Sequence, residues 1–137
     1  NKAISLCKKA GARRTILLPV SAPFHTMMMR PAADRLAQRL ENISFSCPKI
    51  PVIHNVHGRF EDNPEGIKAA VLKQIYSPVL WVQCVERLLN EGTNVFVECG
   101  AGGVLSGLIR RIDKTIQAYT LSTSESFESA LFNISDM

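Results

Sequence analysis

Apolar and polar residues follow one another along the chain with helical spacing in some segments and strand-like runs in others. Apolar residues recur every three or four positions after Pro31, Asn63, Ser77 and Gly103, which predicts four amphipathic helices. Proline in the first turn supports the first three, and Asn63 adds a capping side chain. Shorter apolar runs predict strands at residues 15–18, 52–56, 94–98 and 115–121. Helices alternating with strands indicate an α/β fold.

The two ends of the chain and one internal segment have a different pattern. Residues 2–10 have the pattern of the end of a helix, closed by Gly11, and no initiator methionine precedes them. We therefore expect the sequence to begin inside a longer polypeptide. Residues 20–25 are expected to be irregular because Pro23 interrupts them. The polar tail after Ser122 is expected to fray.

Composition narrows the class of protein. The chain has 137 residues, 46% hydrophobic and 20% charged, which suits one domain with a core and excludes a disordered chain. The net charge is +4, and acidic residues are interspersed among the basic ones, unlike the concentrated basic stripe of a nucleic-acid-binding protein. This mild positive excess suits a small acidic protein as partner. No apolar run approaches the ~20 residues of a membrane span. Four cysteines without a C-x-x-C pair or a secretory signal indicate a reducing, cytoplasmic interior.

One histidine stands out as a candidate for catalysis. His25 lies in the irregular segment between two apolar runs, where catalytic side chains are commonly presented. A lone histidine is more often structural, so both interpretations stay open at this point. The chain contains no G-x-S-x-G, so none of its serines sits on a nucleophile elbow.

Two further motifs favour structural interpretations. His54 and His57 would point to opposite faces of a strand and have no third ligand nearby, so we expect no metal site. The turn 100–103 follows a strand and opens a helix, but Leu105 replaces the third glycine of a dinucleotide fingerprint. A helix start still offers free amides to an anion. A non-catalytic anion-binding module, using this turn with Arg110, Arg111 and Lys114, is therefore one alternative.

Four segments together resemble a known family. Residues 18–25 (LPVSAPFH), 30–34 (RPAAD), 73–81 (KQIYSPVLW) and 98–108 (ECGAGGVLSGL) occur in the order and spacing of bacterial malonyl-CoA:acyl carrier protein transacylases. The family usually has Gly-Pro-Gly where this chain has Ala101 between two glycines. The family's nucleophile elbow, carboxylate-binding arginine and oxyanion-hole amides would all precede the first residue here. The resemblance therefore identifies the chain as similar to the C-terminal half of these enzymes.

The resemblance implies a fold and a reaction. Residues 1–20 would end a small ferredoxin-like insert, and residues 21–137 would be the C-terminal part of an α/β-hydrolase-like acyltransferase domain. The reaction would transfer malonyl from coenzyme A to the phosphopantetheine thiol of acyl carrier protein, through an acyl-serine and without a cofactor or metal. Partners would be malonyl-CoA, acyl carrier protein and the N-terminal half of the same enzyme. This chain alone would be inactive, because it lacks the nucleophile. An acyltransferase domain of a polyketide synthase is the second alternative.

The resemblance also implies roles for individual residues. His25 would be the catalytic base, and the main-chain carbonyl of Gln74 would hold its tautomer. Phe24 would narrow the acyl pocket, and Val104 would lie near the pocket wall. A last pair, Arg110 and Arg111, would contribute to docking of the carrier protein.

Overall fold

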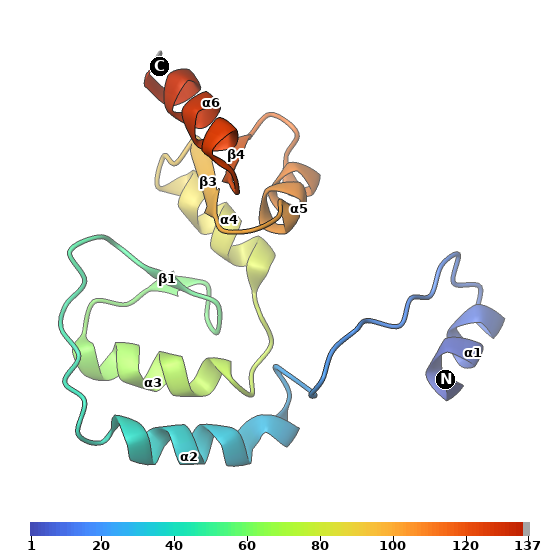
Figure 1. Ribbon diagram of the computed structural model, residues 1–137. Coiled ribbons are helices and arrows are strands. Elements are labelled where there is room, and N and C mark those ends of the chain that lie inside the picture. The colour runs from blue at the N-terminus through green and yellow to red at the C-terminus, as the bar shows by residue number, and fades with distance from the viewer. Residues whose placement is uncertain (136–137) are drawn as a thin grey trace.

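The computed structural model describes residues 1–135 and contains helices around two small sheets (Figure 1). The elements follow in the order α1 (Lys2–Lys9), the 3-10 turn η1 (Met27–Met29), α2 (Arg30–Leu40), β1 (Ile53–His54), β2 (Arg59–Phe60), α3 (Pro64–Gln74), α4 (Trp81–Asn90), β3 (Val95–Cys99), α5 (Val104–Ile112), β4 (Gln117–Leu121) and α6 (Ser124–Ser135). The mixture of helices and strands confirms the predicted α/β class.

The C-terminal part of the chain is built on a β–α–β unit. Strands β3 and β4 pair in parallel, from Val95 opposite Gln117 to Cys99 opposite Leu121, and α5 connects them. A buried hydrophobic cluster in this part comes from α4, α5, β4 and their connections, and consists of Val85, Ile109, Ile116 and Ala118. A parallel pair needs such a crossover, and the crossover helix covers the sheet.

The N-terminal part places two helices beside a short hairpin. Helices α2 and α3 pack side by side, and β1 pairs with β2 in antiparallel fashion (Figure 1). The predicted cap of α3 is present, since Asn63 Oδ1 accepts hydrogen bonds from the amides of Glu65 (2.9 Å) and Gly66 (3.4 Å). The amide of Leu80 donates to the carbonyl of Asn55 at 2.9 Å, which ties the start of α4 to the hairpin.

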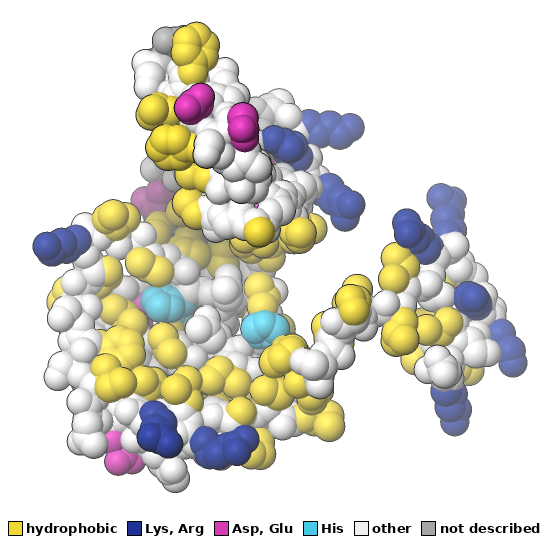
Figure 2. All heavy atoms as spheres, in the orientation of Figure 1, with side chains coloured by type: hydrophobic (Ala, Val, Ile, Leu, Met, Phe, Trp, Pro, Cys, Tyr) yellow, Lys and Arg dark blue, Asp and Glu magenta, His cyan; other side chains and the backbone are white. Residues whose placement is uncertain are grey.

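The prediction of a strand at residues 15–18 is wrong. These residues have no regular structure, and Leu17 is 75% exposed. A strand is stable only when its main chain pairs with a neighbour, and within residues 1–135 no strand pairs with this segment. The segment instead connects α1, none of whose residues is buried, to the rest of the molecule. Figure 2 shows its hydrophobic side chains open to solvent.

Two boundaries in the middle of the chain differ from the predicted ones. The strand expected at residues 52–56 has two residues, and it pairs with β2, where no strand was predicted. The helix expected to begin at Ser77 begins at Trp81. The amide of Leu80 bonds to Asn55 in the hairpin rather than to a carbonyl one turn earlier, so the residues before Trp81 are not helical.

The expectation of a frayed tail is wrong for residues 124–135, which form α6. The amide of Ser126 donates to Thr123 Oγ1 (3.2 Å), and the amide of Thr123 donates to Ser126 Oγ (3.0 Å), a reciprocal cap like a capping box. Helix α6 packs on β4 and buries Ala130. Residues 136–137 of the predicted tail lie outside the described residues. Among residues 1–135, no helix has the length and apolar character needed to cross a bilayer.

Candidate catalytic site around His25

The backbone of His25 has an unusual conformation. His25 has a φ of +60°, and among residues 1–135 no other residue except glycine has a positive φ. Such a conformation costs about 1–3 kcal/mol and persists only where neighbouring structure holds it. The amide of His25 donates to the carbonyl of Ile75 at 3.2 Å, which fixes the residue against the end of α3. Strain of this kind is concentrated at functional sites.

The imidazole of His25 is oriented by a main-chain oxygen. Its Nδ1 lies 3.0 Å from the carbonyl oxygen of Gln74. Because a carbonyl only accepts hydrogen bonds, Nδ1 carries a proton, and in the neutral ring Nε2 therefore keeps its lone pair. The structure thus brings together two residues that the sequence placed in one site. The exposed ring can accept a proton at Nε2 from a group outside this chain.

The position of Gln74 in its helix explains why its carbonyl is available. Gln74 is the last residue of α3, where carbonyl groups lack partners within the helix and carry the negative end of its dipole. His25 therefore satisfies one of these carbonyls.

The loop that carries His25 is braced from within. Thr26 Oγ1 donates to the carbonyl of Pro23 at 2.8 Å, and the amide of Met29 donates to the carbonyl of Thr26 at 2.9 Å. The amide of Phe24 donates to the carbonyl of Ala22 at 2.9 Å. These short-range bonds make residues 22–29 a sequence of tight turns that leads into α2.

The two residues predicted to line an acyl pocket are on different elements. Phe24 adjoins His25 in the loop, and its side chain is largely exposed. Val104 begins α5, after the glycine turn, and is also exposed. No hydrogen bond of the described residues links α5 to the His25 loop. Their lining roles remain predictions.

The glycine turn positions a carboxylate that the sequence analysis missed. Gly100 (φ +137°) and Gly102 (φ +102°) adopt conformations that favour glycine, and the turn folds back so that Glu98 meets the start of α5. Glu98 accepts hydrogen bonds from the amides of Ser106 (2.8 Å) and Leu105 (3.1 Å). The hydrogen bond from the Ser106 amide is the main cause that lowers the pKa of Glu98, and the bond from the Leu105 amide lowers it less.

This contact bears on the anion-binding alternative. The amides expected to hold an external anion are already bonded to the chain's own carboxylate, Glu98. The alternative therefore loses its main support. Glu98 was missed because it lies seven and eight residues before its partners, outside the spacing of local capping motifs.

The basic pair at the end of α5 has two different environments. Both side chains are exposed, but the Arg110 guanidinium donates to the carbonyl of Ala118 on β4. Within residues 1–135, Arg111 makes neither a side-chain hydrogen bond nor an ion pair. Only Arg111 is thus wholly available to a partner.

The pair His54 and His57 differs from its expected geometry. His57 lies in a tight turn rather than on the strand, and the two ring centroids are 5.7 Å apart, so the argument from opposite faces is wrong. Burial, followed by the charge of Arg59, lowers the pKa of His57. In the described part of the chain, no three His, Cys, Asp or Glu side chains are grouped to hold a metal.

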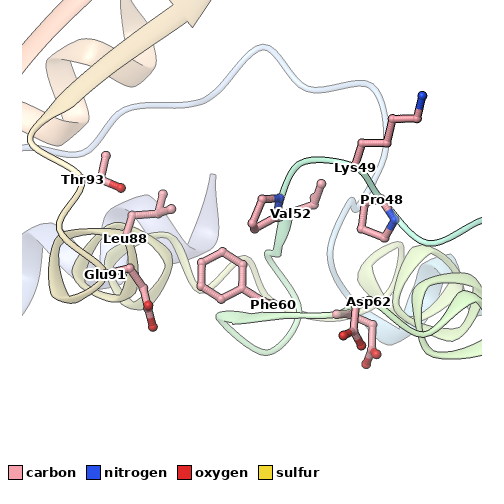
Figure 3. A pocket seen from close by; sticks show the side chains of 10 residues that line it. Pro48, Lys49, Val52, Phe60, Asp62, Leu88, Glu91 and Thr93 are labelled. Carbon is pink, nitrogen blue, oxygen red and sulfur yellow. The ribbon is translucent and has the colours of Figure 1, made fainter.

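A pocket of about 770 Å³ opens elsewhere, between β2, the end of α4 and the loop before β1 (Figure 3). Neither His25 nor Gln74 lines it. Two of its acidic side chains already have partners, since Glu91 pairs with Arg87 (2.5 Å) and Glu61 accepts from the amide of Asn63 (3.2 Å). The pocket is therefore separate from the candidate site.

Comparison with known proteins tests the resemblance. No family model matches the chain. Two curated relatives are named malonyl CoA-acyl carrier protein transacylase. The Escherichia coli protein is 42% identical over 130 residues (95% of this chain, 42% of the relative), and the Bacillus subtilis protein is 36% identical over 129 residues (94% and 41%). This chain thus spans about two fifths of the length of these relatives.

Solved structures give the same result. Malonyl-CoA:acyl carrier protein transacylase from Xanthomonas oryzae is 41% identical with a TM-score of 0.91, covering 96% of this chain and 42% of that one. A type II polyketide synthase acyl-carrier protein in complex with its malonyl-transacylase matches at 42% identity and a TM-score of 0.90, covering 96% and 43%. By sequence and by fold, the chain is a relative of the malonyl CoA-acyl carrier protein transacylases and corresponds to their C-terminal part.

Proposed function

We propose that the complete protein transfers a malonyl group from coenzyme A to the phosphopantetheine thiol of acyl carrier protein in fatty acid synthesis. The observation that carries the proposal is the 3.0 Å contact between His25 Nδ1 and the Gln74 carbonyl, which leaves Nε2 as a proton acceptor. The names of the relatives indicate the same reaction.

The first half-reaction uses His25 as a base and then as an acid. Nε2 takes the proton from the hydroxyl of a serine outside this chain, and the serine oxygen attacks the malonyl thioester carbon. The carbon–sulfur bond breaks, and the departing coenzyme A thiolate receives the proton from Nε2. An acyl-serine remains.

The second half-reaction reverses these roles. The phosphopantetheine thiol gives its proton to His25 Nε2 and attacks the acyl-serine carbon. The carbon–oxygen bond breaks, and the serine oxygen recovers the proton. Each step transfers one proton to and from the same nitrogen, so the reaction needs malonyl-CoA as substrate but no cofactor.

The finer assignments belong to the same proposal. Phe24 would narrow the acyl pocket to malonyl, and Val104 would contribute to its wall. Residues 1–20 would end a ferredoxin-like insert, and residues 21–137 would return to an α/β-hydrolase-like domain. The separation of α1 from the other helices in Figure 1 supports this division. Four unpaired cysteines fit the proposed cytoplasmic location.

The alternatives have less support. The relatives compared above are named as transacylases, and the one that serves a polyketide synthase is described as a protein in complex with its carrier protein, so an acyltransferase domain within a larger synthase is not favoured. The anion-binding module is weakened by Glu98, which occupies the start of α5.

The test uses the complete natural polypeptide that carries this sequence. Incubation with malonyl-CoA should give a malonyl-serine enzyme detectable by mass spectrometry, and addition of holo-acyl carrier protein should discharge it. The variant His25→Ala should lower turnover about 10²–10⁴-fold, the usual contribution of a general base. The 137-residue chain alone should show no turnover, because the serine is absent.

His57→Ala is the matched control, because it removes a histidine that does not contact Gln74. It should retain turnover, and melting temperatures should show that both variants fold. Turnover by His25→Ala within a few-fold of wild type would mean that His25 is structural.

A further inference from the structure

We propose that Arg30 and Tyr76 are positioning residues that hold the His25 loop against the end of α3 and thereby keep Nδ1 of His25 on the Gln74 carbonyl. This inference rests on the proposed function, in which His25 is the base. It concerns two side chains that the sequence analysis assigned no role.

The support is a row of three contacts along consecutive residues. The ring of His25 bonds to the carbonyl of Gln74 (3.0 Å), and the amide of His25 bonds to the carbonyl of Ile75 (3.2 Å). The third contact follows directly, since the Arg30 guanidinium carbon lies 4.8 Å from the centroid of the Tyr76 ring. The segments 25–30 and 74–76 are thus joined at both ends.

Arg30 is itself fixed on a rigid element. It is the first residue of α2, and its Nε donates to Asp34 Oδ1 at 2.9 Å one turn later. The turn η1 connects His25 to Arg30 with only Thr26 between His25 and η1. A shift of Arg30 away from Tyr76 therefore moves the loop that carries the histidine.

The loop needs such support for two reasons. The backbone of His25 has a positive φ, a conformation that is unfavourable for a residue with a side chain. Its ring is exposed, so water competes with the Gln74 carbonyl for the Nδ1 proton. A cation–π contact at an exposed site changes the equilibrium constant between two conformations by about two- to five-fold. Loss of the contact should therefore release a measurable fraction of the loop.

The chain contains a matched control for this arrangement. Arg87 lies 5.6 Å from the centroid of the Phe60 ring and pairs with Glu91 one turn later. The side chains of Arg30 and Arg87 are 53% and 49% exposed, so the two have nearly equal access to water. Arg87 does not contact the His25 loop, and Arg87→Gln removes the same interactions without changing that loop.

The first measurement needs no substrate. In the complete protein labelled with ¹⁵N-histidine, the His25 ring should show a protonated Nδ1 and an unprotonated Nε2. Arg30→Gln and Tyr76→Leu should move the signals toward a mixture of tautomers. Tyr76→Phe keeps an aromatic ring under the guanidinium, so the His25 signals should not move. They should not move in Arg87→Gln either.

The second measurement is kinetic. Arg30→Gln and Tyr76→Leu should lower kcat, by at most about five-fold, without changing KM for malonyl-CoA. Unchanged tautomer and kcat in Arg30→Gln, or equal changes in Arg87→Gln, would overturn the inference. Because Arg30 is half exposed, its variant carries the test even where Tyr76→Leu fails to fold. If Arg30→Gln shifts the tautomer but the wild-type protein transfers no malonyl group, the positioning role is supported and the proposed function is rejected.

Discussion

The imidazole of His25 hydrogen-bonds to the main-chain carbonyl of Gln74, which lies 49 residues further along the chain. In serine proteases an aspartate side chain orients the catalytic histidine. Here the orienting atom is a main-chain oxygen at the end of a helix, so no substitution of a side chain removes it. The tautomer of His25 therefore depends on how the loop and α3 are held together.

The first prediction follows from this use of the backbone. Gln74→Ala keeps the carbonyl that accepts the His25 proton, so turnover of the complete protein should stay within about two-fold of wild type. Steady-state kinetics with malonyl-CoA and acyl carrier protein would check it. A loss of about ten-fold or more, with an unchanged melting temperature, would show that the Gln74 side chain acts in the reaction.

Local signals in the sequence predicted much of the fold. Asn63 and Pro64 specify the start of α3 within a few residues, and the cap is present as expected. Gly100 and Gly102 specify the turn between β3 and α5, because their backbone conformations favour glycine. In each case the determining residues lie within one turn of the feature that they specify.

Features set by distant residues could not be predicted in the same way. The apolar run at 15–18 satisfied the pattern of a strand, but a strand also needs a neighbour, which periodicity does not reveal. The bond from Leu80 to Asn55 delays α4, and the carboxylate of Glu98 reaches across a turn to α5. The helix after Thr123 was missed because its cap uses Ser126 in place of the usual Glu or Gln.

The second prediction concerns the carboxylate at the start of α5. The amide of Ser106 holds the pKa of Glu98 below its ordinary value of 4.5. A group with a lowered pKa in the folded state stabilises the fold above the unfolded pKa and loses this effect as pH falls through the folded pKa. Glu98→Gln should therefore lower the melting temperature of the complete protein at pH 7.

The difference between Glu98→Gln and wild type should shrink as the pH falls below 4.5, since protonation removes the same charge. Calorimetric scans from pH 7 to pH 3 (about one per unit) would measure it. Asp113 and Glu125 also have lowered pKa values, so only the difference between the two proteins isolates Glu98. A difference that is constant across this range would contradict the electrostatic explanation.

The third prediction concerns the proposed acyl pocket. Phe24 adjoins His25, and Phe24→Ser would open space beside the reacting group for the extra methyl of methylmalonyl-CoA. A methyl-sized change in a pocket alters discrimination by ~1–3 kcal/mol. The ratio of kcat/KM for malonyl-CoA to that for methylmalonyl-CoA should therefore fall. An unchanged ratio would remove Phe24 from the pocket, and Phe127→Ser on α6 serves as a control at a similarly exposed phenylalanine.

The fourth prediction concerns docking of the carrier protein, which is acidic as a class. Arg111 has no intramolecular partner among residues 1–135, so Arg111→Glu should reverse a charge without disturbing the fold. Arg110→Glu also removes the bond to the Ala118 carbonyl and should in addition lower the melting temperature. Charges at the edge of an interface set mainly the rate of encounter.

Arg111→Glu should therefore slow transfer from the acyl-enzyme to the carrier protein about ten-fold at low salt, where the screening length is longest, and less at physiological salt. Acylation by malonyl-CoA should stay unchanged, and stopped-flow measurement separates the two half-reactions. Arg39→Glu, on the last turn of α2, makes the same change in net charge on another surface and should leave both rates unchanged. Equal slowing by Arg39→Glu would mean that total charge, rather than the end of α5, attracts the carrier protein, and no slowing by Arg111→Glu would exclude this residue from docking.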